Sequence, residues 1–520
     1  MPSPREKPSP WIIAISVMFG TFMVVLDTTI VNVSLPHIAG SLSASIEEST
    51  WALTSYLAAN AIILPITGWL ANYFGRRRLL LLSVVGFTLA SLLCGLATSL
   101  PILIFWRIVQ GTTGGVMQPL SQAIMLEAFA PKDRGKAMAF FGLGVVVAPV
   151  LGPVLGGWLT DNYSWRWVFY VNLPVGIAAF MMLRAYVFDP PYITRGTAKI
   201  DYWGIGLLAI GIAALQIGLD QGQQEDWFSS DLIVTLAAAA VIGLGGFVVH
   251  ALLARDPVVD LRLFKEPTFA TGVVLITAMG FGLYGSLILM PVLLQTLLGY
   301  PALQAGYAMA PRGLGSLVAM PVVGLLMNRT DPRRMLGLGF LVNAVSLYWM
   351  SSLNLQVGFW DIFWPQFVQG VGLGLLFVPL TTVTMDRIAP KDMGHATSLF
   401  NLLRNIGGAA GIAMIQTVLA RDRQEHVNVL GAHISAYTPS TQLMFQNLRS
   451  TFVARGADLA TATDRAYAAL FGMVQKQAAM LAFIDGFKFL AVVFLLLLPL
   501  VFLMRKPRHH EGPPVAIVAE

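Results

Sequence analysis

The sequence predicts an all-α polytopic membrane protein, in which two six-helix bundles are joined by two further transmembrane helices. Three observations support this fold class: the composition, a series of long apolar stretches and an internal repeat. The 520 residues have a mean hydropathy of +0.70, with 56% hydrophobic and only 12% charged residues. A soluble protein of this length could not bury so much apolar surface, so the bilayer must be the solvent for most of the chain.

The apolar stretches give the number and order of the helices. A run of about 20 apolar residues crosses the hydrocarbon layer as one helix. We expect fourteen spans, at roughly 12–35, 50–72, 79–99, 102–127, 136–160, 166–187, 200–220, 231–253, 268–297, 303–327, 334–354, 358–385, 394–420 and 481–504. The expected domains are an amino-terminal bundle over 1–190, two inserted helices over 191–265, and a carboxy-terminal bundle over 266–520.

The distribution of lysine and arginine predicts the orientation. Most of the 33 basic residues fall in loops on one side, which the positive-inside rule assigns to the cytoplasm together with both termini. The net charge of +6 therefore reflects topology, and no nucleic-acid partner is needed to explain it. The polar segment 421–480 then faces the periplasm. Within this segment, the apolar spacing of residues 461–480 predicts an amphipathic helix with Tyr467, Leu470, Phe471 and Val474 on one face. The alternative is a solvated segment that leads into the last span.

An internal repeat relates the two bundles. Residues 68–78 (GWLANYFGRRR) align without gaps on 324–334 (GLLMNRTDPRR), and 130–135 (APKDRG) align on 389–394 (APKDMG). Gln110-Gly111 matches Gln369-Gly370 at nearly the same offset. Three matches at one offset indicate that the bundles are structural repeats.

Asp27 and Arg107 place opposite charges inside the first bundle. A charge at the centre of a bilayer costs about 2.5–3.5 kcal/mol on insertion scales, and such residues usually face a polar interior and have a partner. We expect the two at similar depth and paired. Burial disfavours the charged form of Asp27 whereas Arg107 favours it, a balance suited to a proton carrier. The alternatives are a helix-end charge in the headgroup region and a purely structural ion pair.

The fifth span carries an unusual density of small residues and prolines. Ala148, Gly152 and Gly156 recur every four residues, so one face of this helix admits very close approach of a neighbour. Ordinary tight packing is the alternative to a special role. The full motif comprises Gly144, Ala148, Pro149, Gly152, Pro153, Gly156 and Gly157.

The loop after the second span is a candidate cytoplasmic gate, or a plain topology signal. Its residues are Gly68, Asn72, Gly75, Arg76, Arg77 and Arg78. Two further cations lie within apolar spans of the second bundle. Arg312 is expected to face the central cavity, whereas Arg404 could face it or extend toward the interface.

The sequence shows few residue patterns typical of catalysis. The histidines show no ligand spacing for a metal, and no phosphate loop, nucleophile motif or carboxylate pair stands out. The single cysteine, Cys94, can form no intramolecular disulfide. We therefore expect no metal, no cofactor and no enzymatic activity.

These motifs together resemble the major facilitator superfamily, and within it the fourteen-span drug:proton antiporters of the EmrB type. The motifs that carry the resemblance are LDTTIVNV at 26–33, GWLANYFGRRR at 68–78, RIVQG at 107–111, the fifth-span motif, and WRWVFYVNLP at 165–174. The resemblance implies that Asp27 and Arg107 serve proton coupling and substrate binding, a role to which we add Asn32 and Arg312. It also implies that the fifth-span motif marks an antiporter.

The resemblance extends to partners. EmrB-type pumps work with a periplasmic adaptor (EmrA-like) and an outer-membrane channel. The predicted function is therefore proton-driven efflux of amphipathic toxic compounds across the inner membrane by alternating access. Two positions depart from the pattern: Asn72 stands where the family usually has an acid, and Gln366 stands where the first bundle has Arg107.

Two other functions compete with this one. A dedicated exporter of one metabolite, lipid or fatty acid, working without an adaptor, would have a similar sequence. A membrane sensor or an intramembrane enzyme is disfavoured by the two-bundle repeat and the thin catalytic chemistry.

Overall fold

The computed structural model describes residues 8–190, 196, 200–254, 257–327, 329–435 and 437–504, and every regular element in these ranges is a helix. The first bundle contains α1 (Pro10–Ser41), α2 (Ile46–Phe74), α3 (Arg76–Gly95), α4 (Leu100–Ala128), η1 (Pro131–Asp133), α5 (Arg134–Asn162), α6 (Trp167–Tyr170) and α7 (Asn172–Tyr186). The inserted pair is α8 (Tyr202–Gln221) and α9 (Asp231–Leu253), with the turns η2 (Trp227–Ser229) and η3 (Leu261–Lys265).

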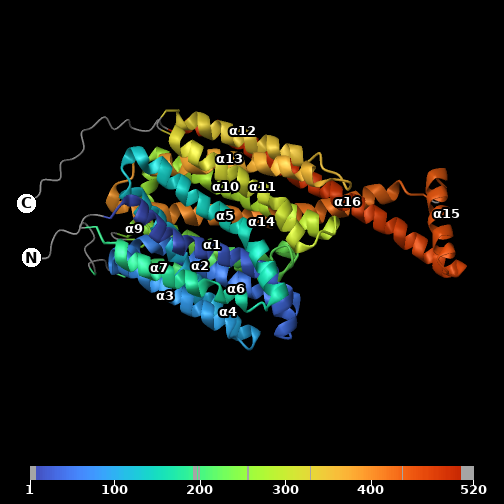
Figure 1. Cartoon of the computed structure of the whole chain (residues 1–520), viewed down its shortest axis with the longest axis horizontal. Helices are drawn as coiled ribbons and strands as arrows, with labels where there is room; N and C mark the ends of the chain where they lie inside the picture. The colour runs from blue at the N-terminus through green and yellow to red at the C-terminus, as the bar shows by residue number, and fades with distance from the viewer. Residues whose placement is uncertain are drawn as a thin grey trace, which may run out of the picture.

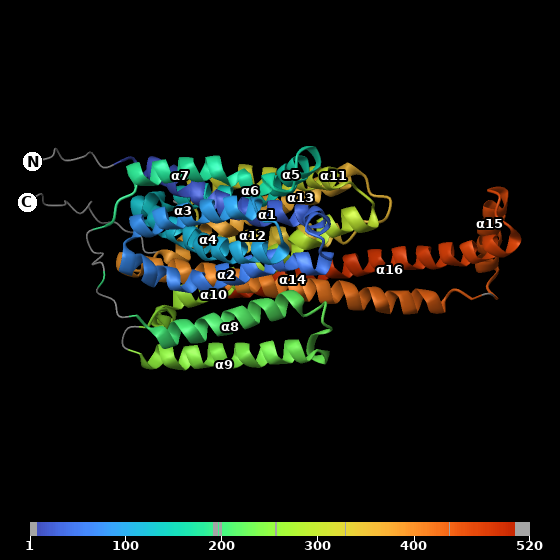
Figure 2. The same ribbon diagram turned by 90° about the horizontal axis from the view of Figure 1, so that it is seen from below.

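The second bundle contains α10 (Pro267–Val292), the π-turn η4 (Leu293–Leu297), α11 (Ala302–Leu326), α12 (Pro332–Met350), α13 (Phe359–Met385), η5 (Pro390–Asp392), α14 (Met393–Ala432), α16 (Leu459–Leu497) and η6 (Leu498–Leu503). The short helix α15 (Pro439–Ala454) connects α14 to α16. The long helices run along one common axis, and α15 lies across it (Figure 1). α1 begins and α16 ends at one end of the molecule, which we call the terminal end, and α15 lies beyond the opposite end, the hairpin end (Figure 2).

The described residues contain twelve helices long and apolar enough to cross a membrane by length and composition. The two other expected spans, α4 and α12, are more polar, because α4 carries Arg107 and Gln110 and the first turn of α12 carries Arg333 and Arg334. Both nevertheless lie among the long helices, α4 against α2 and α3, and α12 against α13 and α16. The expected fold class is confirmed.

The inserted pair α8–α9 lies along one side of the molecule (Figure 2). α8 contacts α2 of the first bundle and α14 of the second. Two polar contacts hold it there: Thr54 on α2 donates a hydrogen bond to the Asp220 carboxylate, and Nε1 of Trp227 donates to Oγ1 of Thr417 on α14 at 2.9 Å. The pair therefore contacts both bundles at once.

The sequence repeat is visible as a symmetric pair of contacts at the terminal end. A Cβ atom on Gly68 of α2 would lie 2.7 Å from the His395 backbone and 2.8 Å from Gly394, both at the start of α14. A Cβ atom on Gly324 of α11 would lie 3.1 Å from the carbonyl oxygen of Gly135, at the start of α5. Gly68 and Gly324 are repeat counterparts, as are Gly135 and Gly394, so each bundle closes on the other through the same motif. Asn328, the counterpart of Asn72, lies outside the described residues.

The described residues of the polar segment 421–480 are mostly helical, but they differ from the expectation in one respect. The amphipathic helix expected at 461–480 is continuous with the last span in α16, and α14 likewise runs past the bundle to Ala432 (Figures 1 and 2). Leu470 and Val474 are buried as expected, whereas Tyr467 and Phe471 are exposed. The buried stripe continues through Ala462, Ala466 and Ala478, small residues whose four-residue spacing suits close helix packing.

Close packing of α5 on α1 sets the position of Asp27. A Cβ atom on Gly152 would lie 3.1 Å from the backbone carbon of Thr29, and one on Gly156 would lie 2.7 Å from the carbonyl oxygen of Ile30. These contacts fall within one turn of Asp27. The small face of the fifth span therefore holds the backbone of α1, and Gly157 on the other face has nothing within 4 Å of its Cβ position.

We predict that Gly156→Ala destabilises the protein and Gly157→Ala does not. The added methyl group at position 156 meets backbone and forces α1 away, a type of overpacking that costs about 1–3 kcal/mol. The measurement is the apparent melting temperature of the two purified variants in the same detergent. Equal melting temperatures would contradict the packing role assigned to this face.

Candidate functional site

Asp27 is fully buried at the centre of a polar network in the first bundle. Its Oδ2 accepts a hydrogen bond from Nη1 of Arg107 at 2.5 Å. Its Oδ1 accepts from Nε2 of Gln110 at 3.0 Å and from Nδ2 of Asn172 at 2.8 Å. The expected pairing of Asp27 with Arg107 is confirmed, and it excludes the alternative of a solvated helix-end charge.

Arg107 is also fully buried, and its guanidinium has further partners on α2 and on its own helix, α4. Its Nε donates to the carbonyl oxygen of Ala52 on α2 at 2.9 Å, and its Nη1 also donates to Oε1 of Gln110 at 2.8 Å. The Tyr56 ring lies 4.1 Å from the guanidinium carbon, which is a cation–π contact. Arg107 therefore ties α1, α2 and α4 together.

Three residues of this network were not among the predicted site residues. Gln110 lies one helical turn after Arg107, so both point to the same side of α4, a relation visible in the sequence. Asn172 begins α7 at the break in the sixth span, and it also donates to Ser91 on α3 at 3.0 Å. Nothing in the sequence indicates that Tyr56 belongs to this network, because its position over Arg107 depends on how α2 and α4 pack.

The charge balance of the network depends on whether Asp27 carries a proton. In a dry interior the two charges are tolerated because they neutralise each other and because Gln110, Asn172 and the Ala52 carbonyl form further hydrogen bonds with them. Protonation of Asp27 would remove the negative charge and leave Arg107 as an uncompensated buried cation, which is strongly unfavourable. The contacts of Arg107 with α1 and α2 must then rearrange, or another anion must replace the carboxylate.

The second bundle contains a counterpart of this network without the acid. Gln369, the repeat partner of Gln110, donates to Oγ of Ser286 on α10 at 3.2 Å, so Ser286 takes the place that Asp27 has on α1. Gln366 stands where the first bundle has Arg107. A cation is present nonetheless, because Nη2 of Arg312 on α11 donates to Ser286 at 3.1 Å.

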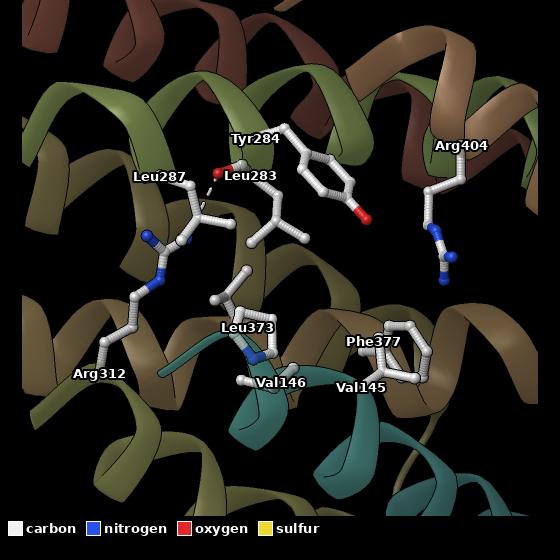
Figure 3. Close-up of a pocket in the computed structure, with 10 residues that line it drawn as sticks. Val145, Val146, Leu283, Tyr284, Leu287, Arg312, Leu373, Phe377 and Arg404 are labelled. Carbon is white, nitrogen blue, oxygen red and sulfur yellow. Dashed lines mark hydrogen bonds between the residues drawn. The ribbon is translucent and has the colours of Figure 1, made fainter. Parts of the chain in front are cut away.

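Arg312 and Arg404 line one small cavity between the bundles (Figure 3). Both are buried, at 3% and 2% exposure. The cavity measures about 40 Å³ and is otherwise almost entirely apolar, with walls formed by Val145, Val146, Pro149, Leu283, Tyr284, Leu287, Leu373 and Phe377. Arg404 therefore faces the interior and does not extend to the interface. A volume of this size holds a few water molecules, whereas drug-sized ligands need about 300–1,000 Å³.

The residues of the fifth-span motif divide between two surfaces of α5. Gly144, Gly152 and Gly156 face α1, since a Cβ atom on Gly144 would meet Met18. Pro149 lines the cavity, and Ala148 is fully buried. One helix thus contacts both the Asp27 segment and the cavity wall. Asn32 is exposed on α1 and does not take part in the Asp27 network, so its assigned role stays a prediction.

The residues of the loop motif, Gly68 to Arg78, make different kinds of contact. Gly68 and Asn72 reach the other bundle, with Nδ2 of Asn72 3.3 Å from Nε2 of His395. Gly75 joins α2 to α3 with a positive φ of 86°, a conformation that favours glycine. The arginines differ among themselves: Arg76 pairs with Glu127 on α4 at 2.5 Å, Arg77 donates to the carbonyl of Arg184 at 2.5 Å, and Arg78 is exposed. Contact across the bundles here is thus made by Gly68 and Asn72, with Arg76 and Arg77 bound inside the first bundle.

Comparisons with known proteins agree with this architecture. Residues 17–412 match the model of the Major Facilitator Superfamily. The chain is 36% identical over 505 residues to the multidrug export protein EmrB of Escherichia coli K12, covering 97% of each chain. It is 37% identical over 509 residues to the fatty acid resistance protein FarB of Neisseria gonorrhoeae, covering 96% of this chain and 97% of FarB.

A solved structure shares the fold at low sequence identity. The human organic anion transporter MFSD10 (TETRAN) superposes with a TM-score of 0.62 at 14% identity, covering 95% of this chain and all of that one. The family match spans most of the chain, and the two bacterial relatives match it almost from end to end. The chain therefore belongs to the major facilitator superfamily, whose members are membrane transporters, and within it to the EmrB-type efflux pumps.

Proposed function

We propose that this protein is a proton-driven exporter of amphipathic toxic compounds that works by alternating access. The observation that carries the proposal is the buried Asp27–Arg107 ion pair, linked by hydrogen bonds to α2, α4 and α7. Ionisable groups inside a membrane bundle usually belong to an ion or substrate pathway. The relatives' names, multidrug export protein and fatty acid resistance protein, agree with export of toxic amphipathic compounds.

Transport requires the contacts between the bundles to open on one side at a time. At the terminal end these contacts are Gly68 with Gly394, and Gly324 with Gly135. Toward the hairpin end, a Cβ atom on Gly306 of α11 would lie 3.0 Å from Val154 of α5. Contacts toward both ends and a cavity of about 40 Å³ describe an occluded state, from which either end can separate.

Several assignments belong to this proposal. Asp27 and Arg107 exchange the proton, while Arg312 and Asn32 contact substrate, and the loop motif from Gly68 to Arg78 acts as the inner gate. The terminal end faces the cytoplasm and the hairpin end faces the periplasm, in the inner membrane, because the basic loops lie at the terminal end. The chain divides into functional units at about residues 190 and 265.

We also propose that the protein is the inner-membrane part of a tripartite system, with a periplasmic adaptor and an outer-membrane channel. The support is the projection formed by the ends of α14 and α16 and by α15, which extends past the bundle (Figures 1 and 2). No residue of α15 is buried among those described, and Leu443 and Val453 are 61% and 43% exposed. Exposed apolar side chains on an ordered projection suit a docking surface.

We predict that Asp27→Asn abolishes export driven by a proton gradient. An amide has the shape of the carboxylate but cannot take up or release a proton. The measurement is uptake of substrate into inverted proteoliposomes under an imposed pH gradient, and the expected rate is that of liposomes without protein. Asp458→Asn, at the exposed cap of α16, is the matched control and should transport normally.

Loss of folding is separated from loss of coupling by a second measurement. Exchange of labelled for unlabelled substrate across the membrane, without a gradient, needs no net proton turnover. The Asp27→Asn protein should retain this exchange. Gradient-driven export by Asp27→Asn at the normal rate would refute the role of Asp27.

We predict that Leu443→Asp combined with Val453→Asp weakens adaptor binding and leaves proton-coupled transport in proteoliposomes unchanged. Charges on these exposed positions disrupt an apolar contact without touching the bundle. Gln446→Asp, an exposed polar position on the same helix, is the control. The measurement is co-purification with the adaptor, together with drug resistance of cells. Unchanged co-purification and resistance in the double variant would contradict docking at α15.

A further inference from the structure

The inserted helix α8 has an acid at each end, and only one of the two has a basic partner. At the terminal end, Oδ1 of Asp201 lies 2.7 Å from Nε2 of His250 on α9. Toward the hairpin end, Asp220 is partly buried and forms no salt bridge with a described residue. Its carboxylate accepts a hydrogen bond from the Thr54 hydroxyl group instead. Withdrawal from water without a cation nearby favours the protonated form of a carboxylate.

The elements packed against α8 do not supply the missing cation. These elements are α9, α2 and α14. Toward the hairpin end, they and the turn after α8 carry the charged residues Glu48, Glu225, Asp226, Asp231, Arg421 and Asp422. None of these six forms a salt bridge with Asp220. Glu48 is exposed and accepts a hydrogen bond from the backbone nitrogen of Ser45 at 2.8 Å, and Arg421 is exposed as well.

Thr54 connects Asp220 to the turn of α2 that contacts Arg107. Thr54 is buried, with 1% of its surface exposed. It lies between Ala52, whose carbonyl oxygen accepts from Nε of Arg107 at 2.9 Å, and Tyr56, whose ring lies over the Arg107 guanidinium. Residues 52 and 56 share one face of a helix and residue 54 lies on the opposite face. Asp220 is therefore at the depth of the buried ion pair, on the other side of α2.

The inserted helices pack as one unit that is also attached to the second bundle. A Cβ atom on Gly243 of α9 would lie 2.7 Å from Gly211 of α8, so the two helices cross with their backbones in contact. Trp227, in the turn that joins them, donates from Nε1 to Oγ1 of Thr417 on α14 at 2.9 Å. α9 lies outermost, and α8 faces the two bundles (Figure 2). The pair is thus bonded to the first bundle through Asp220 and to the second through Trp227.

We propose that Asp220 is a second proton-binding residue, and that its protonation weakens the attachment of the inserted helices to the first bundle. The proton adds to a carboxylate oxygen of Asp220 and gives a neutral carboxylic acid, and no other covalent bond changes. A hydrogen bond to an ionised group is roughly twice as strong as one between neutral groups. Loss of the charge therefore weakens the contact with Thr54, whereas the contact of Trp227 with Thr417 does not depend on it.

This assignment gives the inserted helices a part in the transport cycle. α8 lies along α2 and α14, which also contact each other across the two bundles. A helix bonded to both bundles resists their separation, and alternating access requires that separation. Protonation of Asp220 loosens one of the two attachments. This role in transport rests on the proposed exporter function, whereas proton binding by Asp220 does not.

The test measures proton binding by the full-length protein in nanodiscs, without any transported compound. Infrared difference spectra between neutral and acidic buffer detect the carbonyl band of a newly protonated carboxyl group, with empty nanodiscs as background. We expect a band that is present in the wild type, lost in Asp220→Asn and retained in Asp27→Asn. Asp226→Asn, at an exposed position in the turn after α8, is the matched control and should keep the band. Identical spectra of the wild type and Asp220→Asn would refute proton binding at this position.

Thr54→Val tests the hydrogen bond while keeping the acid. The valine removes the hydroxyl group, so the band of protonated Asp220 should persist and move to higher frequency, because a carbonyl bond stiffens when its carboxyl group loses a hydrogen-bond partner. A purely structural role of Asp220 predicts no such shift. If Asp220→Asn fails to fold, the shifted band in Thr54→Val still identifies Asp220 as the group that binds the proton. An unchanged frequency in Thr54→Val would overturn the link between this proton and α2.

A transport measurement with ethidium as the probe separates this inference from the exporter function. In inverted proteoliposomes with an imposed pH gradient, Asp220→Asn should take up ethidium at about a tenth of the wild-type rate or less, since a charge-assisted hydrogen bond made and broken in each cycle corresponds to about a tenfold change in an equilibrium constant. Asp226→Asn should transport at the wild-type rate. Uptake by Asp220→Asn at the wild-type rate would refute its role in the cycle. No gradient-driven uptake by the wild type would contradict the exporter, and the infrared spectra would still decide whether Asp220 binds a proton.

Discussion

The buried ion pair between Asp27 and Arg107 constrains the rest of the first bundle. Removing one member of such a pair typically costs about 3–5 kcal/mol, because the other charge is left buried and alone. The pair is tolerable only while α4 holds Gln110, α2 holds the carbonyl of Ala52, and α7 holds Asn172 at hydrogen-bond distance. The small face of α5 packs against α1 within one turn of Asp27, at Thr29 and Ile30.

The two bundles repeat each other in backbone structure but differ in the balance of buried charges. At the terminal end, a glycine of each bundle packs against the equivalent backbone of the other bundle: Gly68 against Gly394, and Gly324 against Gly135. In both bundles a glutamine, Gln110 or Gln369, donates a hydrogen bond to the equivalent position of the first helix, Asp27 or Ser286. At the centre, however, the first bundle balances its own charge and the second does not. In the proposed exporter, this asymmetry assigns the proton to the first bundle and leaves the second bundle free to contact the transported compound.

The sequence was sufficient for features that depend on local pattern or on charge in an apolar run. The order of the helices, the repeat and the Asp27–Arg107 pair were predicted and are confirmed. Features that depend on packing were missed or wrong. Tyr56 and Asn172 meet Arg107 and Asp27 only through the arrangement of α2 and α7, and Arg404 was left between two placements. The stripe from Ala462 to Ala478 consists largely of small residues, so apolar periodicity alone pointed to Tyr467 and Phe471, which are exposed.

Communication between the two halves has a physical path at α4 and α14. Nδ2 of Asn401 donates to Oε1 of Gln122 across the bundles at 2.6 Å, and both side chains are buried. Asn401 lies one turn before Arg404 on α14, and Gln122 lies on the helix that carries Arg107. In the proposed mechanism, a rearrangement of Arg107 after protonation of Asp27 would act on a helix that is hydrogen-bonded to the one holding Arg404. Because a buried amide pair of this kind is costly to separate without new partners, α4 and α14 must either move together or exchange this contact when the bundles rock.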